Sequence, residues 1–295
     1  MYASKGKYLV ITAVLALISI FVVACGGGTS EGSATSGNLT IAGSSALLPL
    51  VQEAATQYQT AHPDVTIAVS AGGSGAGRSQ VCAGDINIGN SDVPISEEEK
   101  QELNCQDAVM TSIAQQAFVM AANPTGPAAV NDLTKQQLQD IFSCKITNWS
   151  EVGGDDQAIV VVNRTQGSGT RATMANYLYG GDDAQFCVGA SEESNNETAY
   201  QTTAQTPGAI TYLGLAYGEQ AGIVVFGIDG IEPPLEGLTG DNNWPITGPG
   251  YSITKGEPTG LAAAFLDFVT SNEFQNQSVL VDLGYLPIPA DQRSN

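Results

Sequence analysis

Basic residues and histidine are scarce in this sequence, and their scarcity excludes several kinds of chemistry. The 295 residues include 10 Lys and Arg against 30 Asp and Glu, and His62 is the single histidine. A protein that binds nucleic acid needs a basic surface to neutralise phosphodiesters, so nucleic acid is not an expected partner. No CxxC pair occurs, and one histidine is too few for a common zinc site, so no metal site is expected.

Sequence motifs for nucleotide binding and for hydrolysis are also missing. No Gly-Lys-Ser/Thr follows a glycine turn at P-loop spacing, and Gly72–Gly77 lacks the GxGxxG spacing of a dinucleotide site. Gly167–Gly169 is one residue short of a Gly-x-Ser-x-Gly elbow. A Ser-His-Asp triad would depend on His62, which precedes Pro63 at a predicted helix end. We therefore predict no enzyme activity and no cofactor.

Residues 1–24 have the pattern of an export signal. Lys5 and Lys7 precede an apolar run from Tyr8 to Ala24, which ends in Val-Val-Ala directly before Cys25. A positive start, an apolar run and a small-residue junction are typical of a secretory signal, and the junction resembles a bacterial lipobox. We expect cleavage before Cys25 and lipid on its thiol, which would anchor the protein on the extracytoplasmic side of the membrane. A short membrane-spanning helix is the alternative.

Residues 25–37 consist almost wholly of Gly, Ser, Thr and Ala and predict a flexible tether. Loss of Lys5 and Lys7 with the signal leaves 10 − 2 = 8 basic residues against 30 acidic ones, a net charge of −22. An anion can still bind to such a chain, because affinity in a pocket depends on local groups such as backbone N–H dipoles and a buried arginine. Net charge acts mainly on solubility and on the rate of encounter.

Strand-like and helix-like stretches alternate along the rest of the chain, which predicts an α/β fold. The expected strands are 39–42, 65–69, 86–88, 117–121 and 159–162. The expected helices are 47–60, 78–83, 96–103, 134–142, 171–179 and 259–270. Ser96 and Thr134 are the expected N-caps of two of these helices.

Three turns share one design, in which a strand ends, Gly and Ser follow, and a helix begins. They are Gly43–Ser45, Gly72–Gly75 and Gly167–Thr170. The free N–H groups and the positive dipole end of a helix N-terminus attract anions, and glycine lets the backbone approach the ligand. One such turn is more often only a helix cap. Three of them, together with Arg164 and Asp92, predict an anion site.

Six segments resemble the phosphate-binding proteins of ABC phosphate importers, a family of periplasmic binding proteins. The resemblance covers nearly all of Asn38–Tyr285, and its more specific parts are Lys-Ile-Thr-Asn-Trp149 and Arg164-x-x-Gly-Ser-Gly-Thr170. The segments are Gly43–Leu50, Gly72–Gly77, Asp85–Asp92, Ile141–Trp149, Arg164–Arg171 and Gly284–Pro287.

The resemblance implies an α/β, two-lobed periplasmic-binding-protein fold of type II, with a mixed sheet in each lobe and the ligand in the cleft between them. Lobe one is expected at 38–117 plus 244–295, and lobe two at 118–243. The implied ligand contacts are Ser45, Ala46, Ser74, Gly75, Asp92, Arg164, Ser168, Gly169 and Thr170. A one-residue shift of the alignment would replace Ser45 by Ser44.

The implied ligand is inorganic phosphate, and the implied partner is the permease of an ABC transporter, with the binding protein as a monomer. Asp92 would select against sulfate, because a carboxylate tolerates an anion that donates a proton to it and repels one that cannot. Without the resemblance, Asp92 is equally well read as a loop cap. A receptor for sulfate or molybdate, and a surface phosphate-sensing or adhesion protein on the same fold, are the alternatives.

The sequence departs from the family at two positions near the binding arginine. Gln166 stands where some members carry an acid that holds this arginine, and Arg171 follows the Gly-Ser-Gly-Thr turn. Arg171 is expected to add positive potential or an interlobe contact.

Four cysteines remain after Cys25, and an even number in an exported chain predicts two disulfides. Three pairings are possible from the sequence alone. The expected lobes favour Cys82–Cys105 and Cys144–Cys187, because each pair then lies within one lobe.

Overall fold

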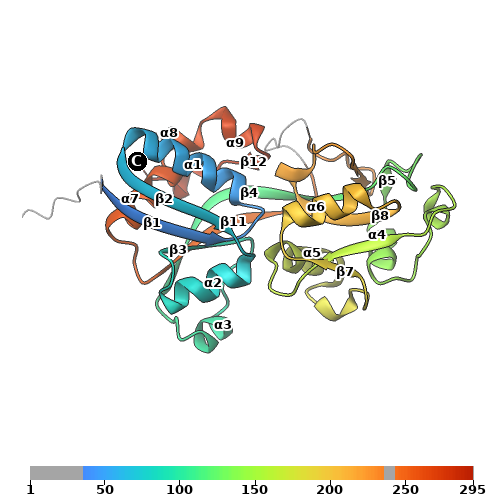
Figure 1. The fold of residues 1–295 in the computed structure, drawn as a ribbon, viewed down its shortest axis with the longest axis horizontal. Coiled ribbons are helices and arrows are strands. Elements are labelled where there is room, and N and C mark those ends of the chain that lie inside the picture. Colours follow the sequence, from blue (N-terminus) through green and yellow to red (C-terminus); the bar gives the residue numbers. More distant parts are fainter. Residues whose placement is uncertain (1–35, 236–242, 295) are drawn as a thin grey trace, which may run out of the picture. The chain divides into compact units, whose positions relative to one another are not determined.

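In the part of the chain that the structure describes, ten strands form one mixed sheet in the order β2-β1-β3-β11-β4-β8-β6-β7, with β9 and β12 paired to β4, and β5 and β10 form a separate pair. The computed structural model describes residues 36–235 and 243–294, so the predicted signal, the tether and Cys25 lie outside the described residues. Figure 1 shows the arrangement of the elements.

The strands are β1 (Ser36–Gly43), β2 (Asp64–Ala71), β3 (Ile88–Ser91), β4 (Ala108–Ala122), β5 (Asp132–Leu133), β6 (Val160–Arg164), β7 (Ser191–Glu193), β8 (Ala209–Gly214), β9 (Val224–Val225), β10 (Gly227–Ile228), β11 (Thr247–Lys255) and β12 (Tyr285–Leu286). The helices are α1 (Leu48–Ala61), α2 (Ser74–Ala83), α3 (Glu97–Glu102), α4 (Lys135–Phe142), α5 (Gly169–Tyr179), α6 (Asn196–Gln205), α7 (Gly260–Thr270), α8 (Asn272–Gln275) and α9 (Ser278–Asp282). Four short 3-10 turns complete the described secondary structure.

The predicted α/β character is confirmed. Parallel pairs β1–β2, β1–β3, β6–β7 and β6–β8 flank antiparallel pairs of β4 with β11 and with β8. In Figure 1, α1 lies beside β2 and α6 beside β8, and the packing contacts agree. The predicted caps are also confirmed: Ser96 Oγ accepts from the N–H of Glu99, and Thr134 forms a capping box with Gln137.

The two halves of strand β4 have different main partners in the sheet. Residues Ala108–Ala117 pair with β11, and residues Phe118–Ala122 pair with β8. The sequence predicts only 117–121 as a strand, because the first half of β4 contains Thr, Ser and Gln and has no continuous apolar run. That half is nevertheless held in the sheet by partners on both sides, since β12 also pairs with it at Gln115 and Gln116.

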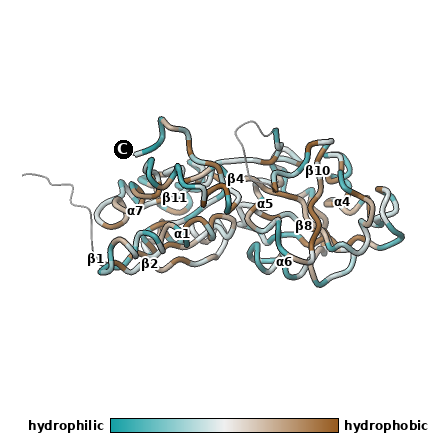
Figure 2. The backbone as a smooth tube through the Cα atoms, turned by 90° about the horizontal axis from the view of Figure 1, so that it is seen from above, coloured by the Kyte–Doolittle hydropathy of each residue, from teal (hydrophilic) through white to brown (hydrophobic). Residues whose placement is uncertain are grey.

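Two large groups of buried apolar side chains support the sheet. The first, called here the β1 core, contains Leu39, Ile41, Leu50, Phe265 and Leu266 among others. The second, the β8 core, contains Phe118, Phe142, Trp149, Ile210 and Tyr212 among others. Figure 2 shows the hydrophobic colouring along β8, which lies inside this second core.

Helix α2 and the third strand also begin elsewhere than predicted. Helix α2 begins at Ser74 rather than at Arg78, because Gly73, with a positive φ of +85°, is already its N-cap. The third strand begins at Ile88 rather than at Ile86, although Asn87 directly before it still donates its backbone N–H to the Thr40 carbonyl at 3.0 Å. The side-chain Oδ1 of Asn87 also accepts the N–H of Thr40, at 2.8 Å.

The structure contains the two favoured disulfides, Cys82–Cys105 and Cys144–Cys187, so the predicted pairing is confirmed. Their Cα atoms lie 5.3 and 5.4 Å apart, within the usual range for a disulfide. Sequence separations of 23 and 43 residues correspond to about 3.5 and about 4 kcal/mol in a chain-entropy model of the unfolded state. The predicted limits of the two lobes remain a prediction.

Candidate functional site

The carboxyl ends of β1, β2, β3 and β6 bring the predicted anion-binding residues together. Ser44 and Ser45 follow β1, Ser74 begins α2 after β2, and Asp92 follows β3. Ser168 is the N-cap of α5 after β6, and its Oγ accepts from the N–H of Arg171. Ligands bind at such strand ends in open α/β sheets, because the loops there are free of ladder bonds and lead into helix N-termini.

Asp92 lies at the centre of these turns and is 5 % exposed. Its carboxylate accepts hydrogen bonds from the Ser44 hydroxyl, from Thr170 Oγ1 at 3.1 Å and from Gln116 Nε2 at 3.3 Å. Its backbone N–H donates to Ser74 Oγ at 3.0 Å. Burial raises the pKa of Asp92 above its ordinary 3.8, although these hydrogen bonds and Arg164 act in the opposite direction.

Arg164 is the buried cation of the site, with 1 % of its surface exposed. Its Nε donates to the carbonyl of Glu193 at 3.1 Å, and its Nη2 lies 3.3 Å from the Ser194 carbonyl and 3.4 Å from Ser45 Oγ. Among the residues that the structure describes, no acceptor meets its buried Nη1. Burial lowers the pKa of Arg164, while Tyr212 and Asp92 raise it. A buried guanidinium with an unused donor is suited to an anionic ligand.

Arg171 does not supply a free positive charge to the site. Its Nε lies 2.6 Å from Asp183 and its Nη1 lies 3.0 Å from Glu192, so two carboxylates neutralise it. Nη1 also donates to the carbonyl of Arg164 at 2.6 Å. Arg171 therefore holds the end of β6 in place. Of the two expectations for Arg171, added positive potential is not what this geometry supports.

The turns approach one another closely enough that glycine is required. The N–H of Gly75 donates to the carbonyl of Gly167 at 2.8 Å. A Cβ on Gly169 would lie 2.2 Å from Ser74 Oγ and 2.8 Å from the Cβ of Asp92, so any side chain there would force these neighbours to shift. The start of α5 thus lies directly against the Ser74 and Asp92 turns.

The structure brings the predicted residues into one neighbourhood, and their individual roles toward a ligand remain predictions. The N–H of Ala46 donates to Ser44 Oγ at 3.0 Å, and the N–H of Gly75 donates to the carbonyl of Gly167. Gln166, at the position of the family's acid, is exposed. In place of that acid, two backbone carbonyls hold Arg164.

Sequence reasoning missed two polar residues of this neighbourhood, Gln116 and Asn196, which are 2 % and 0 % exposed. Gln116 reaches Asp92, and Asn196 reaches Ser45. The only local signal was the Asn195-Asn196 pair before a helix, which indicates a cap and nothing more.

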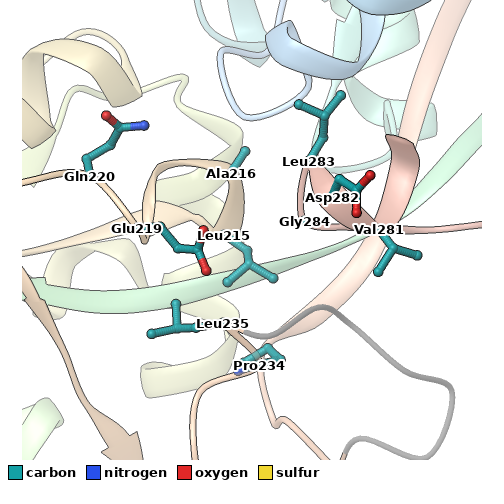
Figure 3. Close-up of a pocket in the computed structure, with 10 residues that line it drawn as sticks. All are labelled: Leu215, Ala216, Glu219, Gln220, Pro234, Leu235, Val281, Asp282, Leu283 and Gly284. Atoms are coloured by element: carbon teal, nitrogen blue, oxygen red, sulfur yellow. The ribbon is translucent and has the colours of Figure 1, made fainter. Parts of the chain in front are cut away.

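A cavity of about 210 Å³ elsewhere in the fold has the wrong charge for an anion (Figure 3). Glu219 and Asp282 line it together with apolar groups such as Leu215 and Leu283, and none of the nine predicted contact residues lines it. Within residues 36–235 and 243–294 no group of three or more His, Cys, Asp or Glu is placed to hold a metal. In the same part of the chain no helix is long and apolar enough to cross a membrane.

Comparison with known proteins identifies the family. Residues 28–273 match the PBP superfamily domain. The phosphate-binding protein PstS of Bacillus subtilis is 41 % identical over 96 % of this chain and 95 % of its own length. That of Borreliella burgdorferi is 24 % identical over 85 % and 90 %.

A solved structure from Clostridium perfringens, a putative phosphate ABC transporter substrate-binding protein with bound phosphate, is similar with a TM-score of 0.77. Its identity is 27 %, over 86 % of this chain and all of that one. An ABC-type phosphate transport receptor from Vibrio cholerae shares the fold with a TM-score of 0.63 at 23 % identity, over 85 % of this chain and all of that one. The chain therefore belongs to the PBP superfamily and, within it, to the phosphate-binding PstS proteins.

Proposed function

We propose that this protein binds inorganic phosphate outside the cytoplasm and delivers it to the permease of an ABC transporter. The observation that carries the proposal is Arg164, a fully buried cation with an unused Nη1 donor beside Asp92. The N-termini of α2 and α5 lie at the same place and add partial positive charge. The names of the relatives, which refer to phosphate binding and phosphate transport, support the same ligand.

The proposed architecture is two-lobed, with phosphate in the cleft between the lobes. The β1 core and the β8 core are two separate groups of apolar side chains, which supports one core for each lobe. Ser45, Ser74 and Asp92 would belong to lobe one, and Arg164 and Thr170 to lobe two. Each lobe would contribute part of the donor set, so that closure around the anion completes the site and expels water.

The proposed role of Asp92 is to favour binding of an anion that carries a proton. HPO4 2− and H2PO4− can donate a hydrogen bond to its carboxylate, and sulfate, fully ionised near neutral pH, cannot. Arg164 would supply the attraction for any tetrahedral oxyanion. Arg164 would therefore attract the anion, and Asp92 would select among anions.

Replacement of Asp92 by Asn should improve sulfate binding relative to phosphate. Asn removes the negative charge that repels sulfate and provides an amide that donates to an anion. Calorimetric titration with phosphate, sulfate, arsenate and molybdate measures the ratio, and Asp282→Asn is the matched control, because Asp282 lies in the other cavity. A wild-type protein that prefers sulfate or molybdate would contradict the phosphate proposal. An unchanged phosphate-to-sulfate ratio in Asp92→Asn would contradict only the role of Asp92.

The thermal stability of the same variant shows whether it is folded. Because burial raises the pKa of Asp92, its contribution is most favourable at low pH and is lost as the pH rises from 3.8 through the raised folded-state pKa. Phosphate-free Asp92→Asn should therefore melt no lower than wild type near neutral pH. Its advantage should shrink as the pH falls toward 3.8, because the raised pKa lets the buried aspartate take up a proton before an unfolded one does.

The proposed localisation is extracytoplasmic, with the protein held to the membrane as a monomer by lipid on Cys25. The apolar run that ends directly before Cys25 supports this proposal. Mass spectrometry of the N-terminal peptide from a membrane fraction should find Cys25 as the first residue with diacylglycerol on its sulfur. An intact residue 1–24 segment, or an unmodified Cys25, would contradict the anchor while leaving phosphate binding unaffected.

A further inference from the structure

The hydroxyl of Ser45 is surrounded by hydrogen-bond donors. The backbone N–H of Asn196 lies 3.0 Å from Ser45 Oγ, and the side-chain Nδ2 of Asn196 lies 2.8 Å from it. Arg164 Nη2 adds a third, longer contact at 3.4 Å. Ser45 and Asn196 are 3 % and 0 % exposed, so these contacts are shielded from bulk solvent.

These contacts leave the Ser45 hydroxyl with one unused hydrogen-bonding group, its O–H donor. A serine hydroxyl has two acceptor lone pairs and one O–H donor. The two donors from Asn196, at 3.0 and 2.8 Å, are enough to occupy both lone pairs, so the O–H must point to another group. In the described part of the chain no protein acceptor receives this O–H. Ser45 is thus prepared to donate to an anionic oxygen of a ligand.

Asn196 is fixed by bonds on its other side. Its Oδ1 accepts the N–H of Gly214 at 3.0 Å, which determines that Nδ2 faces Ser45. The end of β8 is packed against the same turn, since a Cβ on Gly214 would lie 3.0 Å from the Cβ of Ala46. Tyr217 adds a bond from its hydroxyl to the Ser45 carbonyl at 3.1 Å. The first residue of α6 is therefore bound rigidly to the turn after β1.

We propose that Asn196 is a positioning residue of the phosphate site, which occupies the acceptor lone pairs of Ser45 and turns its O–H toward the anion. The proposal rests on the proposed phosphate function and deepens it. It also makes Asn196 a link between the turn after β1 and the start of α6, which are 151 residues apart in the sequence. Loss of the link should free the Ser45 hydroxyl to rotate and weaken binding without removal of a ligand contact.

A double-mutant cycle tests this role, with the phosphate dissociation constant measured by calorimetry. Ser45→Ala and Asn196→Ala should each weaken binding by about tenfold, the size of one hydrogen bond to a charged group. The double variant should be no weaker than Ser45→Ala, because Asn196 acts through Ser45. Additive losses of about a hundredfold would show an independent, merely structural effect and would overturn the proposal.

Two further variants keep the test decisive. Asn195→Ala is the matched control, because Asn195 caps the same helix through the N–H of Thr198 and does not touch Ser45; it should bind phosphate as wild type does. Asn196→Asp keeps an acceptor for Gly214 but offers Ser45 an acceptor as well, so it should bind more weakly than Asn196→Ala. Wild-type affinity in either Asn196 variant overturns the proposal, whereas failure of the wild type itself to bind phosphate overturns the function.

Discussion

Arg164→Ala should weaken phosphate binding by at least about tenfold at every pH, a loss of about 1.4 kcal/mol or more. Hydrogen bonds to charged groups contribute about 1.5–3 kcal/mol each, and the guanidinium offers the site an unused Nη1 besides its charge. Arg164 stays protonated across the range in which phosphate changes its charge, although burial lowers its pKa. The loss of phosphate affinity in Arg164→Ala should therefore be the same at pH 6 and at pH 8.

The measurement is calorimetric titration with phosphate at both pH values. Lys145→Ala removes the same charge from a side chain that is 70 % exposed, and should leave the dissociation constant unchanged. A circular-dichroism melt of the phosphate-free variants separates loss of binding from loss of fold. Tight binding by Arg164→Ala, or a loss that appears only at one pH, would contradict the assigned role.

Gly169→Ala should weaken phosphate binding by about ten- to a hundredfold, the range expected when a methyl group is forced into a packed contact. The added Cβ would lie 2.2 Å from Ser74 Oγ and 2.8 Å from Asp92 Oδ2, so the start of α5 could not approach the other turns. Alanine is otherwise favourable at this helical position, and Gly169 has no left-handed backbone. The Gly169→Ala variant should fold normally, but its proposed lobes should not close around phosphate.

Gly248→Ala is the matched control, because a Cβ there meets nothing within 4 Å and the backbone is not left-handed. The phosphate affinity of Gly75→Ala should lie between those of Gly169→Ala and Gly248→Ala, because a Cβ on Gly75 would lie 3.1 Å from the backbone of Gly167. Calorimetry gives the affinities, and small-angle scattering with and without phosphate reports closure. Binding by Gly169→Ala within twofold of wild type would show that the contact between these turns is not needed.

The sequence predicts those parts of the site whose residues lie within a few positions of one another. A strand end, a Gly-Ser turn and a helix start follow one another within a few residues, so Ser74, Ser168 and Arg164 can be found without the fold. Arg164 was also recognisable from its family motif. The close approach of Gly169 to Asp92 was not predictable, because it depends on how two distant turns meet.

The parts that the sequence missed depend on contacts between remote segments. Gln116 lies in the polar half of β4, and only the position of that strand brings it to Asp92, 24 residues away. Asn196 is 151 residues from Ser45 and looks like a second capping residue.

The continuity of β4 limits the kind of movement that the two cores can make. Its 15 residues run without a break from the part paired with β11 to the part paired with β8. A strand already rises by about 3.3 Å per residue, close to the maximum length of a polypeptide, so it cannot be stretched further. It can still bend and twist at small cost near Ala117 and Phe118, where its partner changes. The cores can therefore rotate about this point, but they cannot move apart along the strand.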